Sequence, residues 1–253
     1  MRTVVRTDRG KIRSHNEDYG AVAKNRSGTL LAVVCDGMGG HKAGDVASRM
    51  AGELLQKAWE ETEEITTGEE AESWFRTHIQ EINEKIFARS QEEEELQGMG
   101  TTIVSAICTD TFATIANVGD SRCYVINKTG LKQVTDDHSL VNELVKIGEL
   151  TKEAAEHHPQ KNVLLRALGT ELEVVVDIVT VSFHKDDYLL LCSDGLTNQI
   201  SDEEIKDIIC SKKPLEEKAQ QMIELANQYG GEDNITLVLI NHAAKEETGE
   251  PSC

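Results

Sequence analysis

Residues 30–41 read LLAVVCDGMGGH, and the fold is organised around this stretch. An apolar run rich in branched side chains is typical of a strand that is buried on both faces. The run ends in Asp36, and three glycines follow within four residues, which lets the backbone turn sharply and approach a bound group closely. From residue 43 the apolar residues recur at helical spacing. The stretch therefore predicts a carboxylate at the end of a rigid strand, a geometry that suits a hard cation.

Taken alone, residues 30–41 also fit a simple strand-to-helix turn with an incidental aspartate. The glycine spacing fits neither G-x-G-x-x-G nor G-x-x-x-x-G-K-[ST], so a nucleotide loop is excluded. The metal interpretation gains weight because four further aspartates flank strand ends, at Asp18, Asp120, Asp194 and Asp233. Like charges brought close disfavour ionisation unless a cation neutralises them. Oxygen ligands without a nearby cysteine or a clear histidine-ligand motif select Mg²⁺ or Mn²⁺ over Zn²⁺.

Other hydrolase chemistries do not fit the sequence. The serine of Gly119–Cys123 lacks the second glycine of a G-x-S-x-G elbow. No cysteine has an arginine six positions later, and neither Asp-x-Asp nor H-E-x-x-H occurs. What remains is metal-assisted attack by water, in which two ions roughly 3.5–4 Å apart activate a bridging water and clamp a phosphoryl group. Arg13 is the expected anion clamp, because a guanidinium matches phosphate oxygens in a planar fork. The alternative for Arg13 is a surface salt bridge.

Composition limits the class of protein. The 253 residues are 39% hydrophobic, which is enough for one large core, so we expect a single domain over residues 1–241 and a disordered tail over 242–253. The formal net charge is −19, which argues against nucleic acid or an anionic membrane as the main partner. None of the six cysteines forms a C-x-x-C pair, and the N-terminus lacks an apolar core. We therefore expect a cytoplasmic protein with reduced cysteines.

The apolar periodicity predicts strands, helices, strands, helices and a final strand. This grouping indicates an α+β fold in which antiparallel sheets are covered by helices. The expected strands are 3–7, 19–23, 30–36, 101–108, 111–118, 122–126, 131–134, 174–181, 188–192 and 234–240. The expected helices are 43–59, 71–90, 139–147, 151–156, 202–210 and 215–229.

Six motifs resemble those of a known family. They are Arg13-Ser14-x-Asn16-Glu17-Asp18, Asp36-Gly37-Met38-Gly39-Gly40, Gly100-Thr101-Thr102, Gly119-Asp120-Ser121-Arg122, Ser193-Asp194-Gly195-Leu196 and Gly231-x-Asp233-Asn234. In this order they resemble the metal-dependent type 2C serine/threonine protein phosphatases, and the bacterial branch is the nearest match. The resemblance covers the chain from residue 3 to about residue 240.

The resemblance implies a central β-sandwich of two antiparallel sheets flanked by helix pairs, with two Mn²⁺ or Mg²⁺ ions at one end. It implies that Asp36 bridges the ions, that the Gly37 carbonyl binds one, and that Asp194 and Asp233 complete the other. Further implied roles are Asp18 as a metal ligand, Glu17 and Asn234 acting near the metals through water, and Arg13 holding the substrate phosphate. A third, weaker ion would fall on Asp120 and Asp194, and residues 142–167 would form a flap beside the substrate groove.

One position departs from the animal members of the family. They have a histidine, a proposed general acid, where this chain has Met38. His41 is a nearby candidate for that role, and a metal-bound water is the other. A histidine in a glycine-rich turn can also be purely structural.

The expected activity is hydrolysis of phosphoserine and phosphothreonine in proteins, including a cognate serine/threonine kinase and its substrates, by a monomeric enzyme. One alternative is a catalytically inactive module that binds phosphoproteins. That reading would require the loss of a core carboxylate, and none is missing. The other alternative is a metal-dependent phosphatase of small phosphate esters, which only substrate profiling distinguishes.

Overall fold

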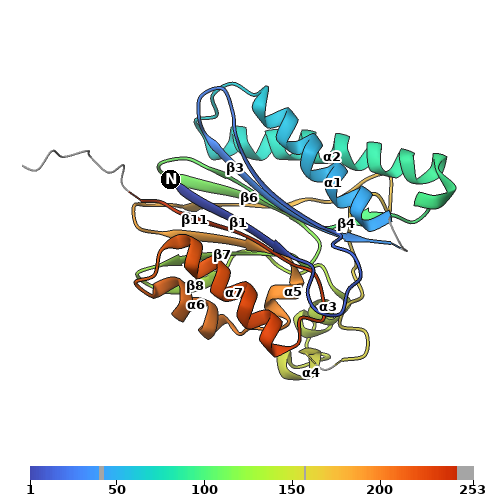
Figure 1. Cartoon of the computed structure of the whole chain (residues 1–253). Helices are drawn as coiled ribbons and strands as arrows, with labels where there is room; N and C mark the ends of the chain where they lie inside the picture. The colour runs from blue at the N-terminus through green and yellow to red at the C-terminus, as the bar shows by residue number, and fades with distance from the viewer. Residues whose placement is uncertain (40–42, 157, 244–253) are drawn as a thin grey trace, which may run out of the picture.

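Two antiparallel sheets stack face to face, and a pair of helices covers each outer surface (Figure 1). The computed structural model describes residues 1–39, 43–156 and 158–243. His41 and the expected tail beyond residue 243 therefore lie outside the described residues. The α+β sandwich expected from the sequence is confirmed. Within the described ranges, no helix is long and apolar enough to cross a membrane.

The first sheet has the strand order β1-β11-β10-β7-β8. These strands are β1 (Arg2–Asp8), β11 (Ile235–Asn241), β10 (Tyr188–Cys192), β7 (Arg122–Asn127) and β8 (Gly130–Gln133). The second sheet has the order β2-β3-β5-β6-β9, and β4 pairs with the end of β3. Its strands are β2 (Asp18–Lys24), β3 (Leu30–Met38), β4 (Gly100–Thr101), β5 (Ile103–Cys108), β6 (Phe112–Val118) and β9 (Asp177–Ser182).

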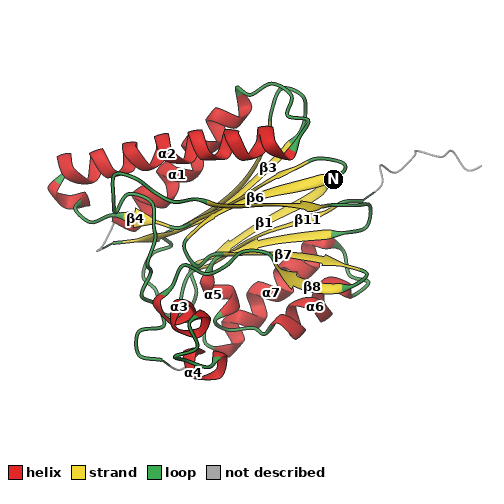
Figure 2. Ribbon diagram, turned by 180° about the vertical axis from the view of Figure 1, so that it is seen from behind, coloured by secondary structure: helices red, strands yellow, loops and turns green. Residues whose placement is uncertain are grey.

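The helices fall into two layers and a cluster at one end, which Figure 2 shows from behind. One layer is α1 (Ala43–Glu60) with α2 (Gly68–Glu92), and the opposite layer is α6 (Asp202–Cys210) with α7 (Leu215–Tyr229). At one end lie α3 (Leu140–Lys146), α4 (Lys152–Glu156) and α5 (Asp194–Thr197), and a 3₁₀ turn, η1 (Glu94–Leu96), follows α2. Capping boxes at Thr67 and Ser201 begin α2 and α6.

The alternation of β3 explains why its sequence is apolar on both faces. Leu31, Val33 and Cys35 belong to the core beneath α1 and α2. Leu30, Ala32 and Val34 belong to the core between the two sheets. Successive side chains of a strand point to opposite faces. Asp36 therefore continues the row that enters the sandwich, at its open end.

Most elements match the sequence predictions, and the misses have local causes. The expected strand 101–108 is interrupted at Thr102, whose backbone and hydroxyl both bond to the backbone of Asp36. The expected strand 174–181 begins only at Asp177, because Gln80 and Asn83 of α2 bond the backbone of the preceding segment. The four-residue helix α5 was not predicted, since its start is also the end of an apolar strand.

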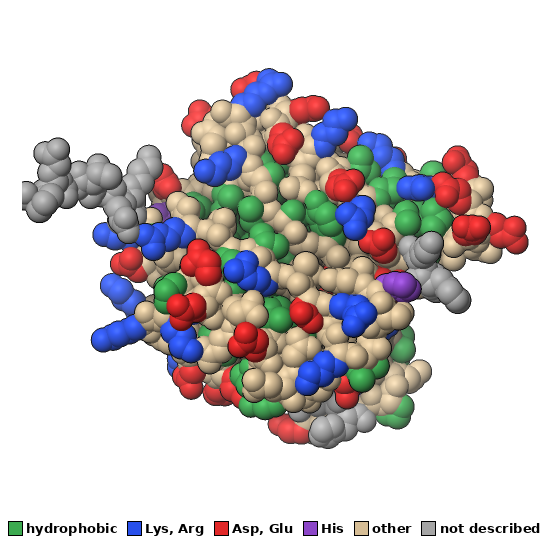
Figure 3. All heavy atoms as spheres, viewed as in Figure 1, with side chains coloured by type: hydrophobic (Ala, Val, Ile, Leu, Met, Phe, Trp, Pro, Cys, Tyr) green, Lys and Arg blue, Asp and Glu red, His purple; other side chains and the backbone are tan. Residues whose placement is uncertain are grey.

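The acidic excess is spread over the surface. On the face shown in Figure 3, basic and acidic side chains are interspersed, and neither sign of charge dominates that face. Of the six cysteines, Cys35, Cys108, Cys123 and Cys192 are buried and free. Cys210 is also free but exposed, so the expectation of cysteines packed as small apolar residues holds for four of the five that are described.

Candidate metal centre

The polar motifs of the sequence converge at one end of the sandwich, on the right in Figure 1 and on the left in Figure 2. Backbone contacts bring them together: Lys11 donates to the Gly231 carbonyl, and Gly37 donates to the Glu17 carbonyl. The segments that meet are the loop between β1 and β2, the end of β3, the turn after β6, the start of α5 and the loop before β11. Strand ends supply aspartates there because the sheets stop and the backbone turns.

Asp18 and Asp36 are directly opposite each other on the antiparallel pair β2–β3. Side chains at opposed positions lie on the same face of a sheet, about 4.5–5.5 Å apart at Cβ. The backbone of Asp36 is held from the other side, since its amide donates to the Thr102 hydroxyl at 2.9 Å and its carbonyl accepts from the Thr101 hydroxyl at 3.0 Å. The position of Asp36 is therefore fixed by both neighbouring strands.

Gly37 sits where three backbone segments come within contact distance. A Cβ on Gly37 would lie 2.1 Å from the Gly44 carbonyl oxygen and 2.6 Å from the Glu17 carbonyl oxygen. Only glycine fits there, because any side chain would push α1 and the β1–β2 loop apart. Gly37 thus serves close backbone approach, as the sequence predicted.

Asp194 lies at the first position of α5, immediately after β10. It lies near enough to Asp36 for its charge to raise the pKa of the Asp36 carboxyl, and it accepts a 3.0 Å hydrogen bond from the Asn198 amide. A Cβ on Gly195 would lie 1.9 Å from the Asn234 carbonyl oxygen, so α5 is pressed against the loop that carries Asp233. These contacts place Asp194 between Asp36 and Asp233.

Burial and mutual repulsion raise the pKa values of this group of carboxyls. Burial raises the pKa of Asp18 to about 7 despite hydrogen bonds from Ser193 and Thr236. Burial, with repulsion from Asp194 and from Asp137, raises the pKa of Asp120 to about 7 as well. For Asp36, burial and then repulsion from the neighbouring aspartates raise the pKa well above its ordinary value.

Burial and repulsion by Asp233 also raise the pKa of Asp194. Carboxylates forced together in this way are relieved when a cation neutralises them. The chemistry of the cluster therefore favours a divalent ion.

Three buried carboxylate oxygens have no hydrogen-bond partner among the described residues. They are Glu17 Oε1, Asp18 Oδ1 and Asp194 Oδ1. Buried polar atoms are normally satisfied, so an orphaned group needs an explanation such as a bound ion. Within the described ranges, no three acidic, histidine or cysteine side chains already converge as a closed ligand cluster. The all-oxygen donor set nevertheless fits Mg²⁺ or Mn²⁺, because these ions take carboxylate oxygens and retain several waters.

Arg13 reaches the cluster from the β1–β2 loop. Its Nη2 donates a 2.7 Å hydrogen bond to Asp233 Oδ2, with half of the arginine side chain and 30% of the aspartate side chain exposed. Burial disfavours its charge, but the bond to Asp233 and the attraction of nearby carboxylates raise its pKa overall. Arg13 is thus a permanent cation at the rim of the site rather than a member of a remote surface pair.

The Asn234 side chain holds the loop that carries Arg13 and Glu17. Its Oδ1 accepts from the Glu17 amide at 2.8 Å, and its Nδ2 donates to the carbonyls of Arg9 and His15 at 2.8 and 2.9 Å. The side chain is therefore engaged by backbone, which positions the loop. Burial raises the pKa of the neighbouring Glu17 carboxyl.

Asp120 follows the turn after β6, and hydroxyls connect that turn to β3. The Thr102 hydroxyl, which accepts from the Asp36 amide, also shares a buried 2.8 Å bond with the Ser121 hydroxyl. On the other side, the Ser193 hydroxyl donates to Asp18 Oδ2 at 2.8 Å and accepts from the Thr236 amide. Thr102, Ser121 and Ser193 occur in the sequence motifs, but the motifs alone predicted no role for them. Ser121 and Ser193 stand next to Asp120 and Asp194 in the sequence, which was the available signal for those two.

Met38 lies against Gly100, with its methyl carbon 2.8 Å from the position that a Cβ there would take. His41, the candidate named from the sequence, lies outside the described residues.

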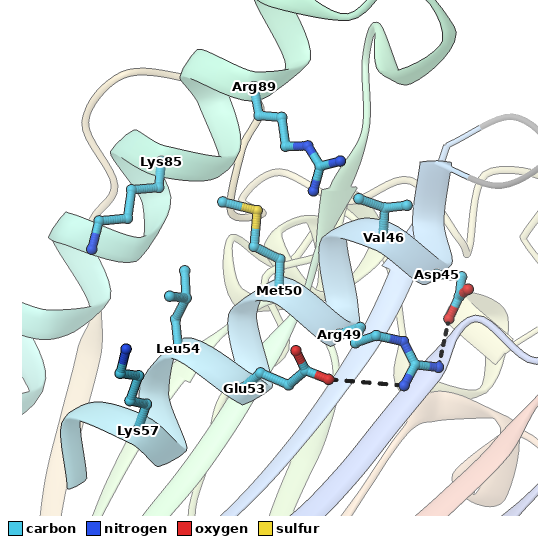
Figure 4. Close-up of a pocket in the computed structure, with 9 residues that line it drawn as sticks. All are labelled: Asp45, Val46, Arg49, Met50, Glu53, Leu54, Lys57, Lys85 and Arg89. Atoms are coloured by element: carbon cyan, nitrogen blue, oxygen red, sulfur yellow. Dashed lines mark hydrogen bonds and ion pairs between the residues drawn. The ribbon is translucent and has the colours of Figure 1, made fainter.

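A separate groove of about 530 Å³ lies between α1 and α2 (Figure 4). Val46, Met50 and Leu54 line it, together with the cations Lys57, Lys85 and Arg89. Asp45 and Glu53 pair with Arg49 at its edge. None of the carboxylates of the metal centre lines this groove, so the two sites are distinct.

The chain is similar to known proteins over nearly its whole length. Residues 10–239 match the family model described as protein phosphatase 2C. A serine/threonine phosphatase, stp, of Listeria welshimeri is 54% identical over 240 residues, which cover 95% of each chain.

Two solved structures are similar over most of their length. The serine/threonine phosphatase Stp1 of Staphylococcus aureus is 42% identical, with a TM-score of 0.89 and coverage of 94% of this chain and 93% of that one. The catalytic domain of the serine/threonine phosphatase PstP, solved with two manganese ions, is 33% identical, with a TM-score of 0.82 and coverage of 94% and 96%.

Proposed function

This chain belongs to the protein phosphatase 2C family, and from that premise we propose how its carboxylates and its arginine perform the reaction. The chain is a metal-dependent serine/threonine protein phosphatase, a phosphoric monoester hydrolase. The substrates are proteins phosphorylated on serine or threonine. The observation that carries the mechanism is the set of buried, unpaired carboxylate oxygens around Asp36.

The ligand set follows from the positions of the aspartates. Asp36 would bridge two ions, with the Gly37 carbonyl on one and Asp194 and Asp233 on the other. Asp18 would bind directly, and Glu17 would act through water. Bound there, two ions supply an activated bridging water and neutralise the oxygens of the phosphoryl group. A third, weaker ion would share Asp194 with Asp120.

Arg13 would bind the substrate phosphate. Its guanidinium stays charged at every relevant pH and presents several donors in one plane. In the structure one of those donors is engaged by Asp233 at 2.7 Å, and half of the side chain is exposed. Phosphate binding would therefore use the remaining donors or replace the bond to Asp233. The positive charge also offsets the repulsion between a phosphate dianion and the surrounding aspartates.

Proton donation to the leaving serine or threonine oxygen is proposed for His41, and a water held by the metal ions would be the alternative donor. This proposal rests on the sequence, in which His41 follows Met38 by three residues in the same glycine-rich segment. Residues 142–167 are proposed as the flap beside the substrate groove of a single domain that spans 1–241. The flap would select among protein substrates.

Oligomeric state, location in the cell and partners are proposed from membership of the family alone. We infer a monomeric cytoplasmic enzyme that reverses a cognate serine/threonine kinase and acts on the kinase itself and on its substrates. Nucleic acid and membrane are not proposed as partners, because the net charge of −19 repels both.

A single assay tests the function. Purified protein is freed of metal with chelator, supplied with Mn²⁺ or Mg²⁺, and given phosphoserine and phosphothreonine peptides in parallel with small phosphate esters. We expect metal-dependent release of phosphate from the peptides that is insensitive to thiol-alkylating agents, because the proposed ligand and phosphate-binding residues include no cysteine. Equal turnover by metal-free and metal-loaded protein would contradict the mechanism, and turnover of small esters alone would contradict the substrate class.

A further inference from the structure

The groove between α1 and α2 has an apolar floor and cationic sides. Three residues of α1 that are only partly buried against the core form the floor: Val46, Met50 and Leu54. Residues four positions apart lie on one face of a helix, so the floor is a continuous stripe. Lys57 of α1 and Lys85 and Arg89 of α2 stand around it (Figure 4). A groove of this composition suits an occupant that is both apolar and anionic.

The two lysines of the groove lack a partner of opposite charge. Within the part of the chain that the structure describes, neither the Lys57 nor the Lys85 ammonium group forms an ion pair or a hydrogen bond. The two carboxylates at the edge of the groove are both paired with Arg49, at 3.3 and 3.9 Å, so they are engaged already. Arg89 pairs with Glu93 at 2.8 Å. The lysines therefore give the groove a local positive charge in a chain whose net charge is −19.

One end of the groove is closed and the other lies beside the metal centre. Just beyond Lys57, Trp59 and Trp74 pack edge to face with their ring centroids 4.9 Å apart, which joins the two helices at their hairpin. At the opposite end, a Cβ on Gly44 would lie 3.0 Å from Glu17 Oε1, so the start of α1 touches the carboxylates. The lining of the groove begins with the next residue of α1. A peptide chain that leaves the metal centre over the start of α1 therefore meets the groove.

The length of the groove determines which part of such a chain it can contact. Its lining on α1 extends from residue 45 to residue 57, which is about 18 Å along the helix axis. An extended peptide advances about 3.3 Å per residue, so roughly five or six residues span this length. With a phosphoserine at the metal centre, the groove would contact residues roughly four to nine positions away from it.

We propose that the α1–α2 groove is a docking site for a segment of the phosphoprotein substrate that carries both acidic and apolar residues. Its apolar side chains would cover the floor, and its carboxylates would pair with Lys57 and Lys85. The inference rests on the proposed action on phosphoproteins and adds a preference among them. The overall charge of the protein repels an acidic peptide, so a local excess of cations is needed to favour one.

A set of matched phosphopeptides tests the preference. In the docking peptide, glutamates and leucines occupy positions roughly four to nine residues from the phosphoserine, on either flank in separate versions. Three controls have glutamine for the glutamates, lysine for the glutamates, or the same acidic segment moved beyond this reach. The wild type should show a kcat/KM about twofold to tenfold higher for the docking peptide than for the glutamine peptide. The gain should appear in KM and should shrink as salt is added, because it depends on exposed charges.

A charge exchange identifies the groove as the origin of the preference. The double variant Lys57→Glu/Lys85→Glu should prefer the lysine peptide to the glutamate peptide. The matched control is Lys132→Glu/Lys206→Glu, which changes the net charge equally at exposed lysines of β8 and α6, on the opposite side of the sandwich (Figure 1). This control should keep the preference of the wild type. A purely structural effect of the substitutions cannot reverse a preference for charge.

Direct binding separates failure of this proposal from failure of the proposed function. The acidic segment without phosphoserine, labelled with a fluorophore, should bind the wild type and the control variant more tightly than it binds Lys57→Glu/Lys85→Glu, as measured by anisotropy. Equal binding to all three proteins, or equal wild-type kcat/KM for the glutamate and glutamine peptides, would overturn the docking site. Failure of the proposed function would instead show as no metal-dependent release of phosphate from any peptide, including the glutamine peptide.

Discussion

Arg13 and Asp233 form a 2.7 Å ion pair that joins the residue proposed for phosphate to a residue proposed for metal. The two lie 220 positions apart in the chain, on loops held together by Asn234 and by close contact between Gly10 and the Asp233 carbonyl. The arginine is therefore in place before substrate arrives. Pre-positioning of this kind lowers the entropic cost of aligning the phosphate.

Arg13→Ala should lower kcat/KM for phosphopeptides roughly ten- to a hundredfold. A charged hydrogen bond contributes about 1.5–3 kcal/mol, and the guanidinium meets substrate while the carboxylates hold the ions. Metal affinity should change little, because loss of a cation beside Asp233 leaves the ligand oxygens in place. Steady-state kinetics and Mn²⁺ titration measure the two effects.

Arg9→Ala is the control for this substitution. Arg9 lies on the same loop, is exposed and makes a single long bond of 3.5 Å to the Ser14 carbonyl. The Arg9→Ala substitution should leave kcat/KM for phosphopeptides unchanged. Equal kinetics for the Arg13 and Arg9 variants would return Arg13 to the role of a surface salt bridge.

Asp36→Asn should reduce turnover to background while the fold survives. The amide of asparagine can no longer bridge two cations. The substitution also relieves repulsion within a buried group of carboxyls, so the melting temperature in chelator should stay the same or rise. Asp45→Asn, with the same change of charge on a half-exposed aspartate of α1, is the control and should keep its activity. Phosphate release and melting curves report both properties, and appreciable turnover by Asp36→Asn would exclude it as the bridging ligand.

The fold was predictable because its signals are local. The doubly apolar pattern of β3 reflects cores on both of its faces, and the polar residues at its end mark where the sheets stop. The bounds of α6 and α7 agree with the expected helices, since each combines a clear periodicity with a defined start and stop. The break at Thr102 was not predictable, because it depends on a bond to Asp36, 66 residues away.

The acidic members of the site were also predictable, while their supports were not. Each aspartate stands beside a glycine or another motif residue at the end of a strand. Thr102 and Ser193 act through partners distant in sequence, since Thr102 bonds the backbone of Asp36 and Ser193 bonds the Asp18 carboxylate. The pairing of Arg13 with Asp233 likewise needs the fold.

Asp120→Ala should retain two tightly bound ions and lose most turnover on phosphopeptides. A site that shares Asp194 with the core pair and has few carboxylates of its own binds more weakly. Calorimetric titration of Mn²⁺ and a melting curve distinguish an ion-binding role of Asp120 from a role in shaping the turn alone. Wild-type ion stoichiometry and activity with a lowered melting point would refute the third-ion assignment.

The stability of the metal-free protein should depend on pH in an unusual direction. Burial raises the pKa of Asp18 from 3.8 in the unfolded chain to about 7 in the folded protein. The folded state then holds the proton more tightly, so this contribution is complete below pH 4 and is lost as pH rises through 7. In chelator, the melting temperature should fall between pH 5 and pH 8, and saturating Mn²⁺ should remove that fall.

Asp18→Asn provides the control for the pH dependence. The variant lacks the titrating group but keeps an oxygen that can accept from the Ser193 hydroxyl, so its melting temperature in chelator should change less between pH 5 and pH 8. An identical pH dependence in variant and wild type would show that Asp18 is not among the groups responsible.

The most direct test of the metal centre is anomalous diffraction at the manganese edge from crystals grown with Mn²⁺. We expect two strong peaks within coordination distance of Asp36, one also at the Gly37 carbonyl and the other at Asp194 and Asp233. A weaker third peak is expected at Asp120. Strong peaks elsewhere, with none at Asp36, would contradict the assignment of this cluster as the catalytic centre.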